Sequence, residues 1–154
     1  MAKATAADAQ LILKLYDLRR EAEIRKARHW WLVTFWPQTP DEIIKVASAF
    51  GTQENNWYRQ VAGYWDMAAA LVLHGTINPN LFVEGGISGE MFFIYAKLQP
   101  FLKELRQKMQ SPGLFSNVEK VATGSKAARE RLKFVSGRVE ARRKDMAAAG
   151  AKAS

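Results

Sequence analysis

The chain of 154 residues is 48% hydrophobic and 11% aromatic, which supplies enough apolar side chains for one packed domain and argues against disorder. It has no cysteine, so disulfides, thiolate nucleophiles and sulfur-ligated metal sites are excluded. The formal net charge is +8, and residues 126–154 hold nine basic against three acidic side chains, so most of the charge belongs to this last segment.

The first predicted element is a long helix from about residue 6 to residue 36. Leu11, Leu15 and Leu18 recur at helical spacing and form one apolar stripe. Pro37 ends the helix. Runs that alternate apolar and polar residues between turn signals are missing, so the sequence predicts no strand.

Helix-capping signals divide the rest of the chain. Thr39-Pro40-Asp41-Glu42 has the form of a capping box, Gly75 is a typical helix stop, and Pro100 predicts a kink. The centres of two of the resulting segments, 53–74 and 88–109, are almost wholly apolar, so we expect these two helices to be buried. The predicted helices after the first cover residues 40–50, 53–74, 78–83, 88–109, 111–124 and 125–149.

These elements predict an all-α fold, a single-domain bundle of about six or seven helices. It has a long N-terminal helix, two buried central helices and a basic C-terminal helix. We expect residues 1–125 to form the bundle body and to stay folded without residues 126–154, which form a basic helix and frayed tail in the same domain or as an appendage. The N-terminus lacks the apolar run of a signal peptide, and the longest apolar stretch, residues 61–73, is too short to cross a bilayer. We therefore expect a cytoplasmic protein.

Asp66 is the only charged residue between positions 61 and 73, so we expect it to be at least partly buried and hydrogen-bonded to a basic or aromatic polar group. It could act as a general base or ligand in an interior pocket. The favoured interpretation pairs it with Arg25, Arg28 or His29 of the first helix, and so places His29 inside as well.

Other patterns that could carry chemistry are weak. His29 and His74 are the only histidines, and no spacing typical of a metal site joins them to carboxylates. The glycine-rich stretch 85–89 could meet an anion through its backbone amides, but a sharp turn between helices is the favoured interpretation. We therefore predict no catalytic residue, no cofactor and no metal, and an enzyme is not expected.

The last helix is the best functional candidate. Its apolar residues recur at spacings of four and three, which predicts a narrow assembly seam that docks on the body or on another chain. The seam includes Leu132, Val135, Val139 and Met146. Arg142 falls on the same heptad spacing. The basic side chains of the helix are candidate contacts to a partner or to phosphate groups, namely Arg129, Arg131, Lys133, Arg138, Arg142, Arg143 and Lys144.

Four segments, residues 15–20, 27–31, 64–75 and 97–102, together resemble a group of small bacterial helical proteins known only as a domain of unknown function. The resemblance covers about residues 11–115 and omits the basic tail. It implies an all-α fold, and it carries no activity, substrate or catalytic residue to transfer.

The sequence thus favours a non-enzymatic helical module for protein interaction and assembly, which associates with copies of itself, most simply as a dimer. The alternative is an accessory protein that binds nucleic acid through its basic C-terminal helix. An anionic membrane surface is a less favoured partner for the same helix. The third interpretation is an enzyme or ligand sensor with an interior pocket around Asp66.

Overall fold

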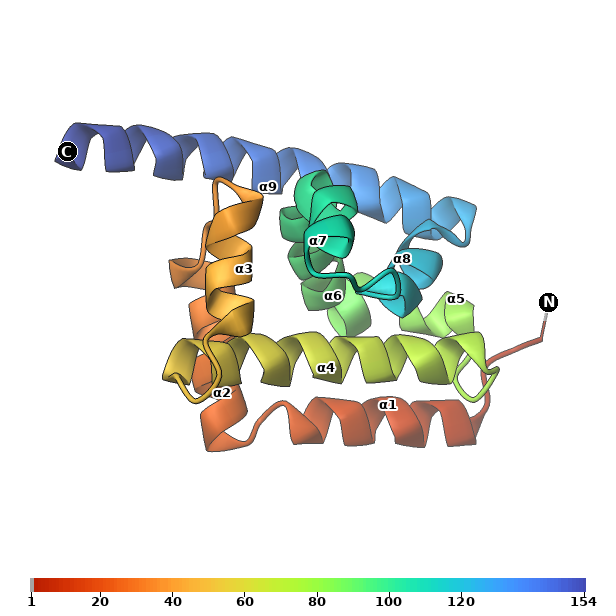
Figure 1. Cartoon of the computed structure of the whole chain (residues 1–154). Coiled ribbons are helices and arrows are strands. Elements are labelled where there is room, and N and C mark those ends of the chain that lie inside the picture. Colours follow the sequence, from red (N-terminus) through yellow and green to blue (C-terminus); the bar gives the residue numbers. More distant parts are fainter. Residues whose placement is uncertain (1) are drawn as a thin grey trace.

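The computed structural model describes residues 2–154, and its regular structure is helical throughout (Figure 1). No strand occurs within these residues, which confirms the all-α prediction, and none of their helices is long and apolar enough to span a membrane. A π-helical turn, η1 (Trp30–Thr34), and a 3₁₀ turn, η2 (Gln99–Phe101), accompany the α-helices. These are α1 (Ala6–Leu18), α2 (Ala22–His29), α3 (Pro40–Ser48), α4 (Gln53–Leu73), α5 (Pro79–Phe82), α6 (Gly85–Leu98), α7 (Leu102–Lys108), α8 (Ser116–Thr123) and α9 (Lys126–Ala153).

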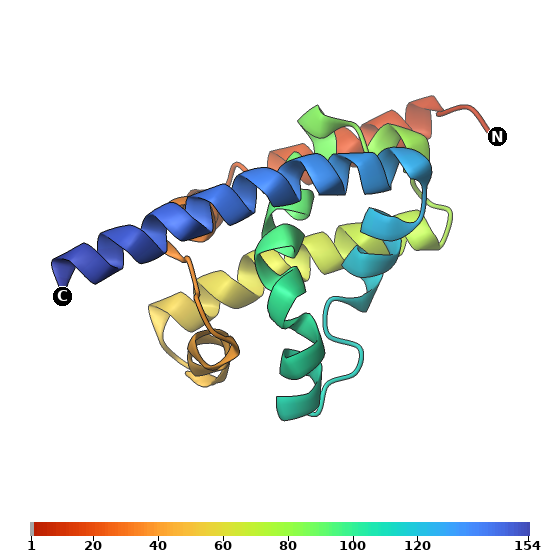
Figure 2. The same cartoon turned by 90° about the horizontal axis from the view of Figure 1, so that it is seen from above.

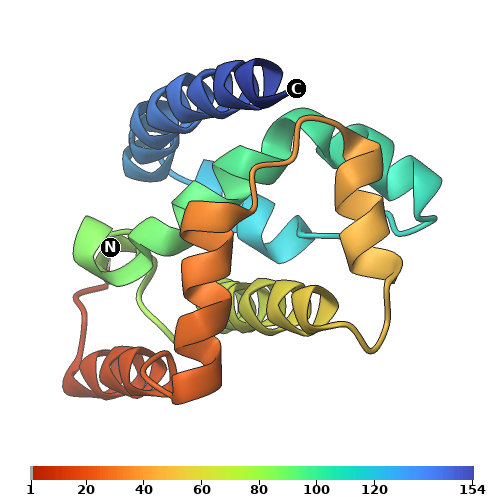
Figure 3. The same cartoon turned by 90° about the vertical axis from the view of Figure 1, so that its left-hand side faces the viewer.

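The long N-terminal helix predicted over residues 6–36 is wrong in one respect, because it is broken at residues 19–21. After this break α2 leaves α1 in a different direction (Figure 3). The carboxylate of Glu21 caps α2 by accepting hydrogen bonds from the backbone N–H groups of Glu23 and Ile24 at 2.9 and 3.0 Å. This cap satisfies N–H groups that the break leaves free. Because the apolar spacing continues across the break without glycine or proline, the sequence pattern merges the two helices.

The two helices predicted to be central, α4 and α6, form the middle of the molecule. α4 matches the predicted range to within one residue. α6 supplies half of the twelve largest fully buried side chains, so the core is centred on it. The predicted helix 88–109 is interrupted at Pro100, where η2 separates α6 from α7, and the predicted kink is thereby confirmed.

Local sequence signals explain several helix ends. The hydroxyl oxygen of Thr39 accepts a hydrogen bond from the backbone N–H of Glu42 at 3.3 Å and caps α3. Gly75 follows α4 with φ of +76°, a left-handed conformation that glycine adopts without strain. Ser125 caps α9 through a hydrogen bond of 3.1 Å from a backbone N–H three residues further on.

α9 lies across α6 and α8 (Figure 2), and its last turns extend beyond α3 (Figure 1). Its buried residues Ala128, Leu132 and Val139 belong to the same hydrophobic core as the rest of the chain. The first half of α9 therefore completes the core. Of the two alternatives for residues 126–154, α9 packs as part of the same domain, and whether residues 1–125 stay folded without it is a matter for truncation.

Candidate functional site

The apolar edge of α9 faces the body of its own chain. Leu132 and Val139 are 7% and 1% exposed, and Val135 and Met146 are half-buried against the same core. Of the two docking alternatives for the seam, the structure contains the intramolecular one. The residues predicted to meet a second copy are thus largely occupied within one molecule.

Beyond Val139 the buried residue of α9 is Arg143, whereas Arg142 is exposed. Arg143 donates from Nη1 to the carbonyl oxygen of Pro37 at 2.5 Å and from Nη2 to that of Lys97 at 2.8 Å. The expectation that Arg143 contacts phosphate on the outer face is therefore wrong. At about 100° per residue, Arg143 lies about 20° from Leu132 and about 40° from Val139 around the helix, whereas Arg142 lies about 80° and about 60° away, so Arg143 shares their buried face.

Lys97 is fully buried beside Arg143. Its Nζ donates to the carbonyl oxygen of Trp31 at 2.5 Å and to that of Phe35, and it lies 4.0 Å from the ring centroid of Trp36. Burial, together with the positive charge of Arg143, lowers the pKa of Lys97 from 10.5 to about 7. One carbonyl oxygen from the first turn of η1 and one from the residue that follows η1 therefore hold this amine among the surrounding aromatic rings.

The outer face of α9 carries most of the predicted phosphate contacts. Five of the seven are exposed, namely Arg129, Lys133, Arg138, Arg142 and Lys144. Within residues 2–154 none of these five forms an ion pair, and the two ion pairs on this helix join Lys126 to Glu130 and Arg143 to Glu140. The sixth, Arg131, is half-buried against the start of α6.

An exposed aromatic ring lies among these charges. Phe134 is 61% exposed, and the guanidinium of Arg138 lies 4.6 Å from its ring centroid. The sequence analysis did not single out Phe134, although its position outside the apolar seam was a usable signal. In proteins that bind single-stranded nucleic acid, bases stack on aromatic rings that lie among basic side chains.

Asp66 is half-buried, and its partner differs from the predicted one. Its Oδ2 accepts a hydrogen bond from Asn117 of α8 at 3.1 Å. The predicted partner Arg28 instead donates from Nε to Glu90 at 2.7 Å, and the indole N–H of Trp65 donates to the same carboxylate at 3.0 Å. One residue turns a helix by about 100°, so Asp66 faces α8 while Trp65 faces Glu90.

His29 is exposed, so its predicted burial is wrong. Its neighbours Ala27 and Trp30 occupy the core-facing positions of this turn, with 0% and 6% exposure. The described part of the chain contains no group of three or more histidine, aspartate and glutamate side chains placed to hold a metal ion.

The glycine-rich stretch 85–89 forms the first turns of α6, so the predicted sharp turn is wrong. Ser88, the first residue of the predicted helix 88–109, is buried within α6. A Cβ at Gly85 would collide with the guanidinium of Arg131, whereas a Cβ at Gly86 would meet open space. Gly85 thus makes room for an arginine that α9 lays over the start of α6.

The comparison with protein families gives one result. A family described as a domain of unknown function (DUF4760) matches residues 4–125. The chain belongs to this family. The resemblance seen in the sequence is therefore confirmed. No curated protein and no solved structure matches the chain. The DUF4760 match ends directly before α9, which nevertheless completes the core of the domain.

Two buried cations of the DUF4760 domain escaped the sequence analysis. Lys97 directly follows the apolar run 91–96, and a charged residue at the end of such a run is ordinarily solvent-facing. Arg19 is only 8% exposed, and its guanidinium lies 5.1 Å from the ring centroid of Trp65. Its spacing of four from Leu15, on the apolar stripe of α1, was the available signal.

Proposed function

We propose that the protein binds nucleic acid through the outer face of α9. The observation that carries this proposal is the orientation of the helix, since its apolar seam is used inside the molecule and its unpaired cations remain outside. The apolar seam was the reason to favour self-association over nucleic-acid binding. Because the seam is buried against the body, the exposed basic side chains are what α9 offers to a partner. The proposal concerns binding only, and no residue is assigned a catalytic role.

The cations stand on both flanks of the exposed face. At 3.6 residues per turn, Lys133 and Lys144 share one flank, while Arg138 and Arg142 share the other. Phe134 lies between them and can stack on an unpaired base, a contact worth about 1–3 kcal/mol. A membrane-surface helix would need an apolar face toward the lipid, and the apolar residues of α9 face the body instead. Nucleic acid is therefore the favoured polyanion.

Fluorescence anisotropy with labelled single-stranded and duplex oligonucleotides tests this proposal. Five phosphate contacts predict a log–log salt slope of about −4.5 on duplex DNA and about −3.5 on a single strand. The double variant Arg138→Gln/Arg142→Gln should lower the magnitude of the slope by the share of about two phosphate contacts. The matched control, Lys14→Gln/Lys45→Gln, removes the same charge from exposed positions of α1 and α3 and should leave the slope unchanged.

Phe134→Ala separates stacking from charge. It should weaken binding to single strands by about tenfold or more and leave duplex binding nearly unchanged. Absence of binding by the full chain at about 50 mM salt would contradict the proposal. Equal weakening by the control double variant would also contradict it, because binding would then follow net charge alone.

Self-association is the second candidate. The observation in its favour is the projecting end of α9, where Met146 is half-buried and residues 147–153 are exposed and mostly alanine. A second copy could pair with this end. Sedimentation equilibrium at tens of micromolar would then give twice the chain mass of 17.4 kDa, and a monomer mass would exclude the dimer.

A further inference from the structure

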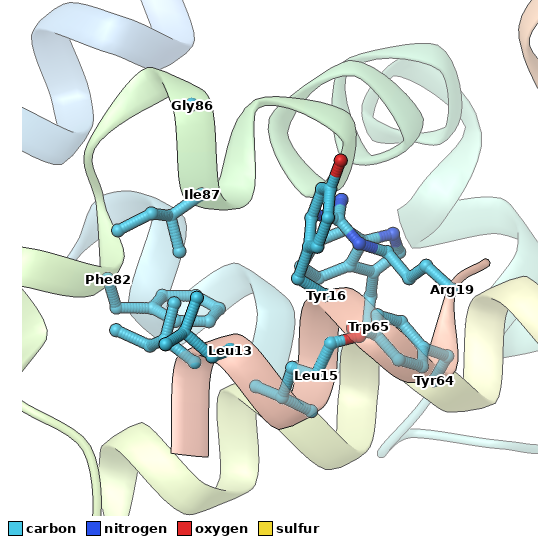
Figure 4. A pocket seen from close by; sticks show the side chains of 10 residues that line it. Leu13, Leu15, Tyr16, Arg19, Tyr64, Trp65, Phe82, Gly86 and Ile87 are labelled. Carbon is cyan, nitrogen blue, oxygen red and sulfur yellow. Dashed lines mark hydrogen bonds between the residues drawn. The ribbon is translucent and has the colours of Figure 1, made fainter. Parts of the chain in front are cut away.

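An apolar pocket lies between α1, α4 and the start of α6, with a volume of about 240 Å³ (Figure 4). Phe82, Ile87 and Leu13 line one end, and Tyr64, Trp65 and Arg19 line the other. The lining residues of α1 run from Ile12 to Arg19 and therefore extend for about 10 Å along the helix. The pocket is elongated, and a cation is placed at one end of it.

Arg19 has an unusual environment for an arginine. Its side chain is stacked between Trp65 and Tyr16, with 5.1 and 5.4 Å from the guanidinium carbon to the ring centroids. Its Nε is buried and has no hydrogen-bond partner, and no carboxylate among residues 2–154 forms an ion pair with it. A buried guanidinium ordinarily has acceptors, because an unsatisfied charged donor costs free energy.

The nearby polar groups are committed elsewhere. Glu90 accepts from Arg28 at 2.7 Å and from Trp65 at 3.0 Å, so its charge is already neutralised. The hydroxyl of Tyr64 donates to the carbonyl oxygen of Leu15 at 2.5 Å. The carboxylate of Glu90 is thus paired with Arg28, and Arg19 has no ion-pair partner among residues 2–154.

From these observations we propose that the pocket binds a free medium-chain aliphatic carboxylate. The carboxylate would accept hydrogen bonds from Arg19, and the alkyl chain would lie along α1 toward Phe82 and Ile87. The pocket lining extends only about 10 Å along α1, which suits a medium-length alkyl chain better than a long fatty acid. The acyl tail of a phospholipid is a poorer ligand, because the anionic headgroup would remain outside the pocket and Arg19 would have no acceptor.

Isothermal titration calorimetry with hexanoate, octanoate and octanamide tests the ligand class. Affinity should rise by about fourfold for each methylene group from hexanoate to octanoate, because each added group is buried. Octanamide has the same shape without the charge, and it should bind about tenfold or more weakly. The proposal is overturned if octanamide binds as tightly as octanoate, or if octanoate shows no saturable binding at millimolar concentration.

Two variants assign the site. Gly86→Leu places a side chain into the pocket from a position whose Cβ meets open space, and it should abolish octanoate binding while keeping the helix. Gly89→Leu is its control, since it lies in the same helix with equal space at Cβ but outside the pocket lining. Octanoate binding that survives Gly86→Leu would overturn the assignment.

Arg19→Gln tests the anchor. It should weaken octanoate by about tenfold or more and leave octanamide unchanged. Lys14→Gln removes the same charge from an exposed position of α1 and should change neither ligand. Thermal unfolding followed by circular dichroism confirms that each variant is folded before titration. Equal weakening of octanoate and octanamide would mean that Arg19 shapes the pocket rather than binding the charge.

Discussion

Two regions of the molecule bury cationic side chains, and they satisfy the charge differently. At the junction of η1, α6 and α9, Lys97 and Arg143 donate to the carbonyl oxygens of Trp31, Phe35, Pro37 and Lys97 itself. Between α1 and α4, the guanidinium of Arg19 lies on two aromatic rings and has no such acceptor within the described residues.

The difference indicates which buried charge is structural. Lys97 and Arg143 each donate to two backbone carbonyl oxygens, so these side chains join three segments that are distant in sequence. Arg19 instead borders a pocket of about 240 Å³ and keeps its donors free. Burial alone is therefore a poor guide to function in this fold, whereas burial without an acceptor beside a pocket points to a ligand.

The largest expected effect on stability comes from removing α9, which also removes Arg143 and its hydrogen bonds to the body. A chain ending at residue 125 loses the burial of Leu132 and Val139 together with several smaller contacts, which lowers the free energy of unfolding by more than about 5 kcal/mol. Urea unfolding followed by circular dichroism should show no cooperative transition. A chain ending at residue 146 is the control and should unfold like the full chain. If both unfold alike, α9 does not complete the core.

Arg143→Met should have the next largest effect. It leaves the carbonyl oxygens of Pro37 and Lys97 buried without a donor, which costs about 2–4 kcal/mol of unfolding free energy. Arg142→Met, one residue earlier and exposed, should change the urea midpoint very little. Equal effects of the two variants would show that the hydrogen bonds of Arg143 do not stabilise the protein.

The lowered pKa of Lys97 predicts that the free energy of unfolding depends on pH. Its pKa is about 7 in the folded protein and 10.5 in the unfolded chain, so between these values only the unfolded chain binds the proton. The free energy of unfolding should therefore rise with pH above 7, by about 1 kcal/mol per pH unit. Urea titrations from pH 6.5 to 9.5 measure this slope, and Lys97→Met should remove it. Parallel profiles for the two proteins would mean that Lys97 is not the titrating group.

Arg19→Met should have the smallest effect on stability. The variant loses two cation–π contacts but leaves no acceptor unsatisfied, so we expect a change within about 1 kcal/mol. The comparison with Arg143→Met is the useful quantity, and differential scanning calorimetry of both variants measures it. A loss as large as that of Arg143→Met would place Arg19 among the structural cations and remove the contrast between the two regions.

The fold class was predictable because helix signals are local. Gly75 ends α4, Thr39 caps α3, and Pro100 interrupts the helix between α6 and α7, each as its own chemistry predicts. The break after α1 was not predictable from apolar spacing, since the stripe of Leu15 and Leu18 continues across it. The capping carboxylate of Glu21 is the local feature that distinguishes this break.

The candidate site was harder to predict, because it depends on which helix faces which. Asp66 was identified as a polar residue in an apolar helix, but its partner Asn117 lies 51 positions further along the chain. The heptad spacing placed Arg142 on the seam, whereas the 3.6-residue turn places Arg143, eleven residues after Leu132, on the buried face. That Arg19 lacks an ion-pair partner within the described residues becomes visible only when Glu90 is seen to be paired with Arg28.

The close packing of Arg131 over Gly85 has a consequence for both proposed sites. Arg131 belongs to the basic helix, and Gly86, the residue next to Gly85, lines the pocket. Through this contact α9 packs against the first turn of α6, which forms one wall of the pocket. The helix that carries the exposed cations therefore also supports the wall of the pocket.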